Sequence, residues 1–102
     1  MILKPGSRWK SAVSNAEVVV VRAPKDEAAL ASGGHPMVAF GAQPPAGLSA
    51  AADLSEELLV GKRYFDEESG TEILCSKAGV GSLTLNERPL LRRDAKPLPA
   101  SD

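Results

Sequence analysis

Apolar and polar residues alternate along this chain in the way that predicts short β-strands and very little helix. The clearest strand covers residues 17–22, where four consecutive valines are β-branched and favour an extended backbone. Because apolar side chains then point to both faces, we expect this strand to be central and buried on both sides. A shorter strand is expected at residues 8–13, connected to the first through Ser14 and Asn15.

Glycine and proline divide the middle of the chain into short pieces. Residues 25–30 suit one helical turn or a polar loop, and residues 32–34 contain two glycines that predict a tight turn. Another strand is expected at residues 36–40. Residues 41–57 are rich in proline, alanine and glycine, which predicts a flexible connector. Near its end, Asp53 could cap a short helix through Ser-Glu-Glu-Leu-Leu.

The C-terminal part of the chain has the pattern of a β-meander over residues 58–95. Turn residues at 68–70 and 86–88 predict two hairpins. The strands of these hairpins are expected at residues 59–67, 71–77, 79–85 and 89–93. A proline-rich tail follows at residues 96–102.

Together these elements predict an all-β fold, with about six or seven short strands and at most one short helix. A small sandwich and a partly open barrel both fit this pattern. The 102 residues are expected to form a single domain with a β unit at 11–40, a connector at 41–57 and the meander at 58–95. No internal repeat is evident from the sequence.

Composition narrows the classes of function. The formal net charge of -1 gives no general attraction to nucleic acid, although residues 41–75 sum to -5 and residues 76–102 to +2. No apolar run is long enough to span a membrane, and the N-terminus lacks the pattern of a signal peptide. With one cysteine, no internal disulfide can form, so we expect a reduced, cytoplasmic setting.

One stretch has the spacing of a metal-binding knuckle. Ser11 and Ser14 are three positions apart, the valine-rich strand follows, and Ser-Gly-Gly-His-Pro-Met occupies residues 32–37. This stretch resembles the desulforedoxin-like domain, the small iron-binding unit that also occurs at the N-terminus of some superoxide reductases. That family has Cys-x-x-Cys-Gly, a strand rich in valine and glutamate, and then Cys-Cys-Gly-x-Pro-Met. Gly34, Pro36 and Met37 match the second motif.

The resemblance implies a site for iron or zinc at four cysteine positions, which here are Ser11, Ser14, Ser32 and Gly33. A neutral hydroxyl is a poor ligand for these metals and glycine has no side chain, so no cofactor is expected. Instead, the serines could hold the turns through hydrogen bonds to the backbone. Serine at these positions is compatible both with evolutionary loss and with deliberate replacement of cysteine.

Cys75 and His35 are the remaining candidates for site chemistry. Lys77 could lower the pKa of the Cys75 thiol and make it reactive, but strand alternation favours a small buried side chain. His35 lies in a loop and could join Cys75 in a metal site shared between two subunits, although a solvated loop histidine is favoured.

Three further clusters of residues have simpler structural interpretations. Residues 66–68 are acidic and could bind a hard cation, but a solvated turn is favoured because the spacing of an EF-hand is missing. Residues 79–82 are glycine-rich but lack the lysine of a phosphate loop, so a turn between strands is favoured. Arg88, Arg92 and Arg93 lack aromatic partners for nucleic-acid binding.

The sequence therefore favours a small non-catalytic β module that acts by protein–protein binding or by self-association as a homodimer. The alternative is a metal-binding or redox protein related to desulforedoxin, with its site lost or rebuilt between subunits. An enzyme that uses Cys75 is a third and weaker hypothesis, because no nucleophile–base pair is evident.

Overall fold

The computed structural model describes residues 1–93, which form three antiparallel sheets and one turn of 3-10 helix, η1 (Ala52–Leu54). The all-β prediction is confirmed. The strands are β1 (Arg8–Lys10), β2 (Glu17–Arg22), β3 (Leu30–Ser32), β4 (His35–Pro36), β5 (Val38–Ala39), β6 (Glu57–Leu58), β7 (Arg63–Asp66), β8 (Thr71–Lys77), β9 (Gly79–Val80), β10 (Leu83–Leu85), β11 (Arg88–Pro89) and β12 (Leu91–Arg93). The predicted end of the meander and the predicted tail at 96–102 lie outside the described residues.

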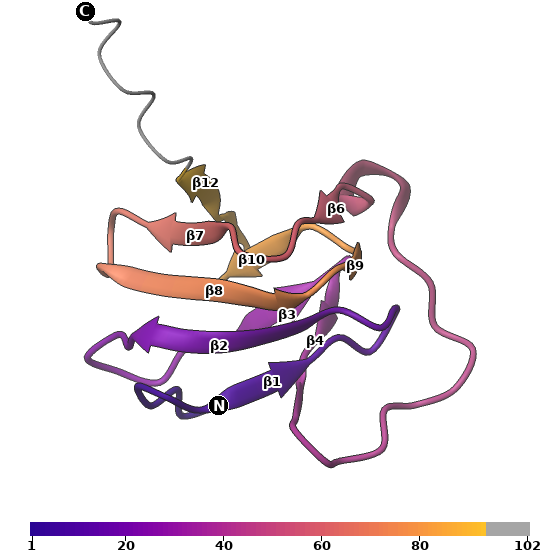
Figure 1. Ribbon diagram of the computed structural model, residues 1–102, viewed down its shortest axis with the longest axis horizontal. Coiled ribbons are helices and arrows are strands. Elements are labelled where there is room, and N and C mark those ends of the chain that lie inside the picture. The colour runs from indigo at the N-terminus through magenta and orange to yellow at the C-terminus, as the bar shows by residue number, and fades with distance from the viewer. Residues whose placement is uncertain (94–102) are drawn as a thin grey trace, which may run out of the picture.

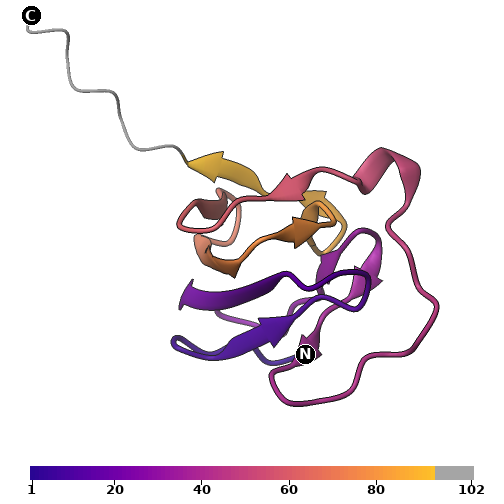
Figure 2. The same cartoon turned by 45° about the vertical axis from the view of Figure 1, so that its right-hand side comes forward.

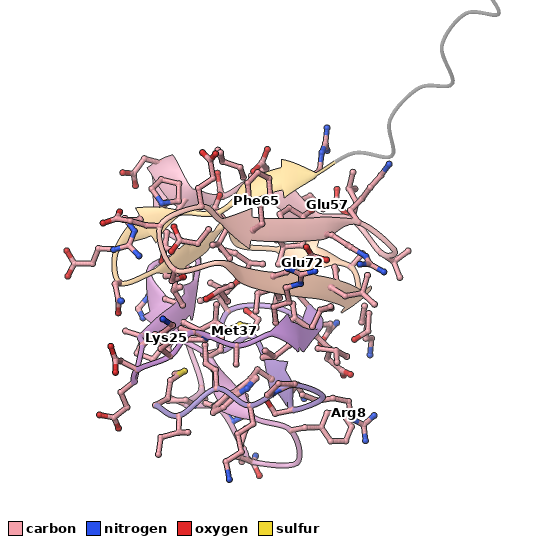
Figure 3. All side chains as sticks on the ribbon, turned by 90° about the vertical axis from the view of Figure 1, so that its left-hand side faces the viewer. Arg8, Lys25, Met37, Glu57, Phe65 and Glu72 are labelled. Carbon is pink, nitrogen blue, oxygen red and sulfur yellow. The ribbon has the colours of Figure 1, made fainter. Side chains whose placement is uncertain are left out.

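Two of the sheets form the layers of the molecule. The front sheet has the strand order β12-β7-β8-β2-β1-β5, and the back sheet has the order β11-β10-β3-β4 (Figure 1). Figure 3 shows Met37 between the two layers and Arg8 on the outer side of the front sheet. The buried apolar side chains fill the space between the sheets, and the largest of them are Leu30, Leu58, Ile73, Leu85, Val18 and Val20.

The chain passes from the back sheet to the front sheet at two similar corners. At the first, Pro36 ends β4 and the buried Met37 precedes β5. At the second, Pro89 ends β11 and Leu90, 9% exposed, precedes β12. Both corner residues donate their backbone N–H to the preceding hairpin, Met37 to Leu30 O and Leu90 to Leu83 O, each at 3.0 Å. Each corner therefore places an apolar side chain in the core where the chain passes from one sheet to the other.

These corners belong to an internal repeat. The strand order of each sheet is palindromic: β5, β1 and β2 match β12, β7 and β8, and β4 and β3 match β11 and β10. The two units meet at antiparallel pairs in which Val20 lies opposite Ile73 and Ala31 opposite Thr84. In both pairs the second residue is 53 positions after the first. The chain is therefore two similar units related by an approximate two-fold rotation.

Backbone hydrogen bonds follow the same rotation. The Gly33 N–H donates to Ser82 O, and at the equivalent place the Asn86 N–H donates to Ala29 O, both at 2.9 Å. The two hairpin turns also match, because their central residues all have positive φ: Gly33 and Gly34 in one, Asn86 and Glu87 in the other. No repeat is evident in the sequence because the two units share backbone geometry while few of their side chains are the same.

The position of the central strand β2 was predicted correctly, but its burial was not. Val18 and Val20 are buried in the core, at 0% and 1% exposure, as expected for a central strand. Val19 is only half-buried, because it points to the outer side of the front sheet, and Val21, at a β-bulge, is also half-buried. The prediction of burial on both sides is wrong for this reason: no second layer covers that face in the described part of the chain (Figures 1 and 2).

The expected short helix through Ser-Glu-Glu-Leu-Leu is also wrong. The helical turn η1 ends before it, and Glu57 and Leu58 form β6, which pairs with β9. Residues 30–32 form β3, a strand that the sequence pattern did not predict. The end of the connector is held against the first hairpin turn, because the Ala51 N–H donates to Gly33 O at 2.9 Å.

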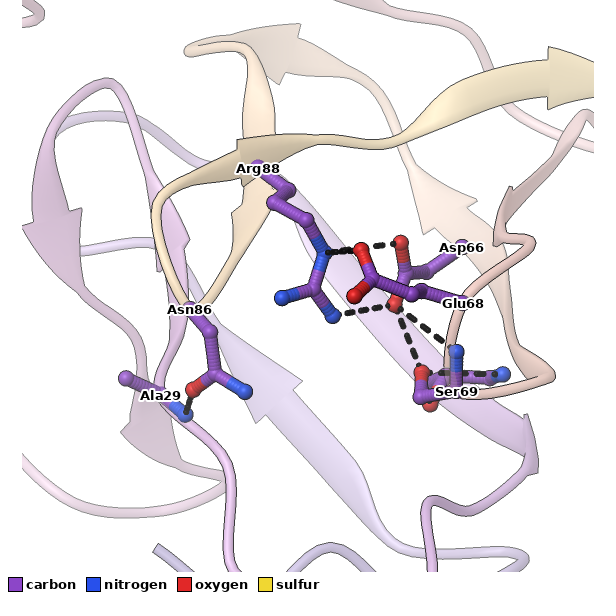
Figure 4. Close-up of polar contacts among 7 residues, drawn as sticks. Ala29, Asp66, Glu68, Ser69, Asn86 and Arg88 are labelled. Atoms are coloured by element: carbon purple, nitrogen blue, oxygen red, sulfur yellow. Dashed lines mark hydrogen bonds and ion pairs between the residues drawn. The ribbon is translucent and has the colours of Figure 1, made fainter.

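A buried carboxylate joins two hairpins of the second unit (Figure 4). Asp66, 6% exposed at the end of β7, accepts hydrogen bonds from Arg88 Nη2 at 2.7 Å and Arg88 Nε at 3.3 Å. Ser69 Oγ donates to the same carboxylate at 2.7 Å. The expectation of a solvated acidic turn is therefore wrong for Asp66. The hydrogen bonds from Arg88, opposed in part by burial, lower the pKa of Asp66 from 3.8 to about 2.

This arrangement predicts an acid-sensitive component of stability. Asp66→Asn should lower the free energy of unfolding by about 2 kcal/mol at pH 7. A lowered folded-state pKa stabilises the protein above the unfolded value, so the difference between the two proteins should shrink as the pH falls from about 4 towards 2. Urea denaturation at several pH values measures it. Glu68→Gln is the control, since Glu68 contacts the same guanidinium at 3.1 Å but its side chain is 73% exposed. Equal losses in both variants would contradict the prediction.

Candidate functional site

The structure brings two of the four knuckle positions into direct contact. Ser11 and Ser32 are both 0% exposed, and Ser11 Oγ donates to Ser32 Oγ at 3.3 Å. Ser32 Oγ in turn donates to Gly81 O at 2.8 Å, and Ser11 Oγ accepts the Val13 N–H at 3.1 Å. The result is a chain of three hydrogen bonds, which we call the serine relay. It connects the loop after β1, the end of β3 and the segment before β10.

The serine relay leaves no strong donor set for a metal. Each of its two hydroxyls both gives and receives a hydrogen bond, so their polar capacity is largely used inside the protein. Iron and zinc in such sites require anionic sulfur or imidazole nitrogen, which these side chains do not supply. The relay therefore fits a structural role, in which hydroxyl bonds hold segments that are far apart in sequence.

The other two knuckle positions differ from the relay. Ser14 is half-buried, and its hydroxyl accepts the Ala16 N–H at 3.2 Å, a contact within one turn. Gly33 has φ +65, and a Cβ built there would lie 2.9 Å from the Ala50 side chain and 3.0 Å from Val13. A ligand-bearing side chain at position 33 would therefore have to displace the connector that packs over this turn.

Cys75 is part of the core and is not placed for nucleophilic chemistry. It is 1% exposed in β8, and its Sγ donates to the backbone carbonyl of Lys77 at 3.2 Å. Burial raises the pKa of the Cys75 thiol. The alternative in which the Lys77 ammonium lowers that pKa is therefore wrong, since it is the Lys77 carbonyl that contacts the sulfur, and burial outweighs this contact.

Within one chain, His35 and Cys75 belong to different sheets. His35 lies in β4 at the edge of the back sheet, opposite Ser32, whereas Cys75 belongs to the front sheet. Among residues 1–93 no group of three or more histidine, cysteine or acidic side chains is close enough to hold a metal ion.

The remaining candidates have structural partners. Gly79 and Val80 form β9, and the carbonyl of Gly81 ends the serine relay, so residues 79–82 are used internally. The expected basic group of three arginines is divided between the two sheets. Arg88 lies in the back sheet and binds Asp66, whereas Arg92 and Arg93 lie in the front sheet.

The outer face of the front sheet was not predicted from the sequence. The registers place Arg8, Val19, Leu74 and Arg63 side by side across four strands. Lys10, Glu17 and Lys77 form a neighbouring row, and Phe65, Glu72 and Arg22 form a third. We call these ten residues the outer face. Alternation within each strand indicates which side chains share a face of that strand. The sequence does not show which distant strands pair, and this pairing assembles the face.

The outer face combines partly exposed apolar side chains with cations. Val19, Phe65 and Leu74 are half-buried, whereas Arg8 and Lys77 are exposed. At one end of the face is a hollow of about 270 Å³, whose lining includes Arg22, Phe65 and Glu72.

Comparison with known proteins adds no family to these observations: no protein-family model matches the chain, and no match is found among curated proteins or among solved structures. Within the described residues, no helix has the length and apolar character needed to cross a membrane.

The serine relay predicts unequal costs for two serine substitutions. Ser32→Ala should lower the free energy of unfolding by about 2 kcal/mol, because the Gly81 carbonyl and the Ser11 hydroxyl both lose a buried partner. Ser14→Ala should cost less than about 1 kcal/mol, because its bond is local and half-buried. Thermal and urea denaturation of both variants measure this. In a double-mutant cycle, the Ser11→Ala and Ser32→Ala costs should be less than additive; additive costs would argue against a direct bond.

Burial of Cys75 predicts a slow thiol. Its rate of alkylation by iodoacetamide at pH 8 should be at least about 100-fold below that of glutathione, because the thiolate requires an exposed, polar environment. In 6 M urea the rate should rise to that of a free thiol. If the native protein is alkylated at a rate comparable with that of glutathione, Cys75 is accessible, and this result would support the hypothesis of an enzyme that uses Cys75.

Proposed function

We propose that this chain is a small non-catalytic β module that binds another protein through the outer face of its front sheet. The observation that carries this proposal is the uncovered face itself. Sheets of soluble proteins usually bury their apolar side chains against another layer, and here Val19, Leu74 and Phe65 are only half-buried. A bound partner would provide the missing layer.

The interior of the protein supports a binding role over a chemical one. The serine relay and the Asp66–Arg88 pair use their polar atoms to hold the fold together. Cys75 is packed in the core. The alternative of a metal-binding or redox protein related to desulforedoxin has no donor set to support it at the former ligand positions.

Binding of a different protein is favoured over a homodimer. The reason to expect a homodimer was that a small core would gain from pairing two copies and covering their strand edges. Within one chain, the two units already pair β2 with β8 and β3 with β10, so much of that gain is internal. The single buried cysteine also supports a reduced, cytoplasmic setting, which is part of the proposal.

The proposal predicts a partner whose capture depends on the outer face. Immobilised wild-type chain should retain a protein from an extract of the cells that naturally make it, and the purified pair should form a complex with a micromolar or lower Kd. Val19→Thr/Leu74→Thr should weaken that complex about tenfold or more, since it removes apolar contact area while threonine, which is β-branched, still suits a strand. Val60→Thr/Val80→Thr is the matched control, because these valines are 62% and 44% exposed outside the outer face.

Three results would count against this function. The first is a complex equally weakened by the control variant. The second is the absence of any protein whose retention depends on the outer face. The third is a dimeric mass in light scattering that Val19→Thr/Leu74→Thr converts to a monomer, because the occupant of the face would then be a second copy.

A further inference from the structure

The charges on the outer face identify the chemistry of the partner, an inference that rests on the proposed function. Five cations project from this face: Arg8, Lys10, Arg22, Arg63 and Lys77. Its two carboxylates are Glu17 and Glu72, which gives a net charge of +3. The whole sequence has a net charge of -1, so the remainder carries -4. The fold therefore gathers positive charge on one face of an acidic chain.

The arrangement of these charges follows the sheet register. Arg8 and Arg63 lie in one row on either side of Val19 and Leu74. Because neighbouring strands are about 4.8 Å apart, three strand spacings separate the two arginines by about 14 Å. The face thus presents an apolar centre about two strands wide with a cation on either side. The internal repeat explains this, since β1 and β7 occupy equivalent places in the two units.

Contacts within the face hold several of these side chains in place. The Arg8 guanidinium lies over the Phe40 ring, 4.0 Å from its centroid. Arg63 Nη1 donates to Glu72 Oε2 at 2.8 Å, which neutralises the carboxylate nearest the apolar centre. Such contacts fix the positions of the cations before a partner arrives, which lowers the entropic cost of binding.

We propose that the outer face binds an acidic protein segment that carries apolar side chains between its carboxylates. The carboxylates would pair with Arg8, Arg63 and Lys77, while the apolar side chains would pack on Val19 and Leu74. Complementary charge of this kind orients a partner and speeds its association.

The same charges disfavour two other occupants. A second copy that docked face to face would bring a net +3 against a net +3, with like charges opposed around the dimer axis. Nucleic acid would place phosphates over Val19 and Leu74, whose apolar side chains offer them neither charge nor hydrogen bonds. The Phe40 ring, an aromatic surface on which a base could stack, already has the Arg8 guanidinium over it.

Selection from a displayed library of random 12-residue peptides tests this chemistry without assuming a partner. Panning on the immobilised wild-type chain should enrich peptides with net negative charge and at least two large apolar residues. For a synthetic peptide of the enriched sequence, the Kd from fluorescence anisotropy should rise at least fivefold with Lys77→Glu and at least twentyfold with Arg8→Glu/Lys77→Glu. Amide shifts in NMR spectra should map to β1, β2, β7 and β8.

Matched variants separate charge, apolar contact and general effects. Lys25→Glu changes the net charge by the same amount as Lys77→Glu, but Lys25 lies on the opposite side of the view from Arg8 in Figure 3, so its Kd should stay within twofold of wild type. Leu74→Thr should weaken the peptide at least fivefold with no change in charge. Circular dichroism and thermal melts confirm that each variant is folded.

Several outcomes would overturn the inference. They are enrichment of neutral or basic peptides, no enrichment at all, equal effects of Lys25→Glu and Lys77→Glu, and tighter binding of a 12-residue oligothymidylate at the same face. Its failure is distinguishable from failure of the proposed function. A native partner whose binding requires Val19 and Leu74 but which is not acidic would contradict only the inference. The lack of any partner whose binding requires the outer face would contradict the proposed function.

Discussion

The pairing of β2 with β8 is the interaction on which the rest of the structure depends. It joins the two units of the chain, with Val20 opposite Ile73 at the centre of the front sheet. Neither unit has enough apolar surface to form a core alone, because the chain has few aromatic residues. Pairing places Val18, Val20, Ile73 and Cys75 on one continuous inner surface, which the back sheet then covers. Proline corners at Met37 and Leu90 return each unit to the front sheet at equivalent places.

Strand pairing between the two units also creates two polar features of the protein. Inside, the pairing of β3 with β10 sets Ser32 opposite Leu83, near Gly81, so the Ser11 and Ser32 hydroxyls and the Gly81 carbonyl can form a buried relay. Outside, the pairing of β2 with β8 sets Arg8 and Arg63 on either side of Val19 and Leu74, although these residues come from distant parts of the sequence. The buried relay and the outer face thus both result from strand pairing between the two units, which is why the proposed function rests on the sheet and not on the knuckle.

The two units differ at the turn where the serine relay forms, because only the first unit has a serine at this position. The position that corresponds to Ser32 in the second unit is Leu85, which is fully buried in the core. One unit therefore closes its turn with hydroxyl bonds and the other with apolar packing and the nearby Asp66–Arg88 pair. These are different solutions to the same problem, since each turn leaves buried groups that require either a hydrogen bond or a dry apolar contact.

The sequence by itself determined the all-β class, the central strand at β2, both hairpin turns and the burial of Cys75. These follow from local rules: valine runs favour strands, positive φ favours glycine and asparagine, and alternation assigns side chains to faces. Only the tertiary structure decided the repeat, the serine relay, the burial of Asp66 and the outer face. The two units share Leu30 with Leu83 and Pro36 with Pro89, too little for sequence comparison to detect, although their backbones match. Each of these features needs residues tens of positions apart, and strand register, which brings them together, is set by packing across the whole core.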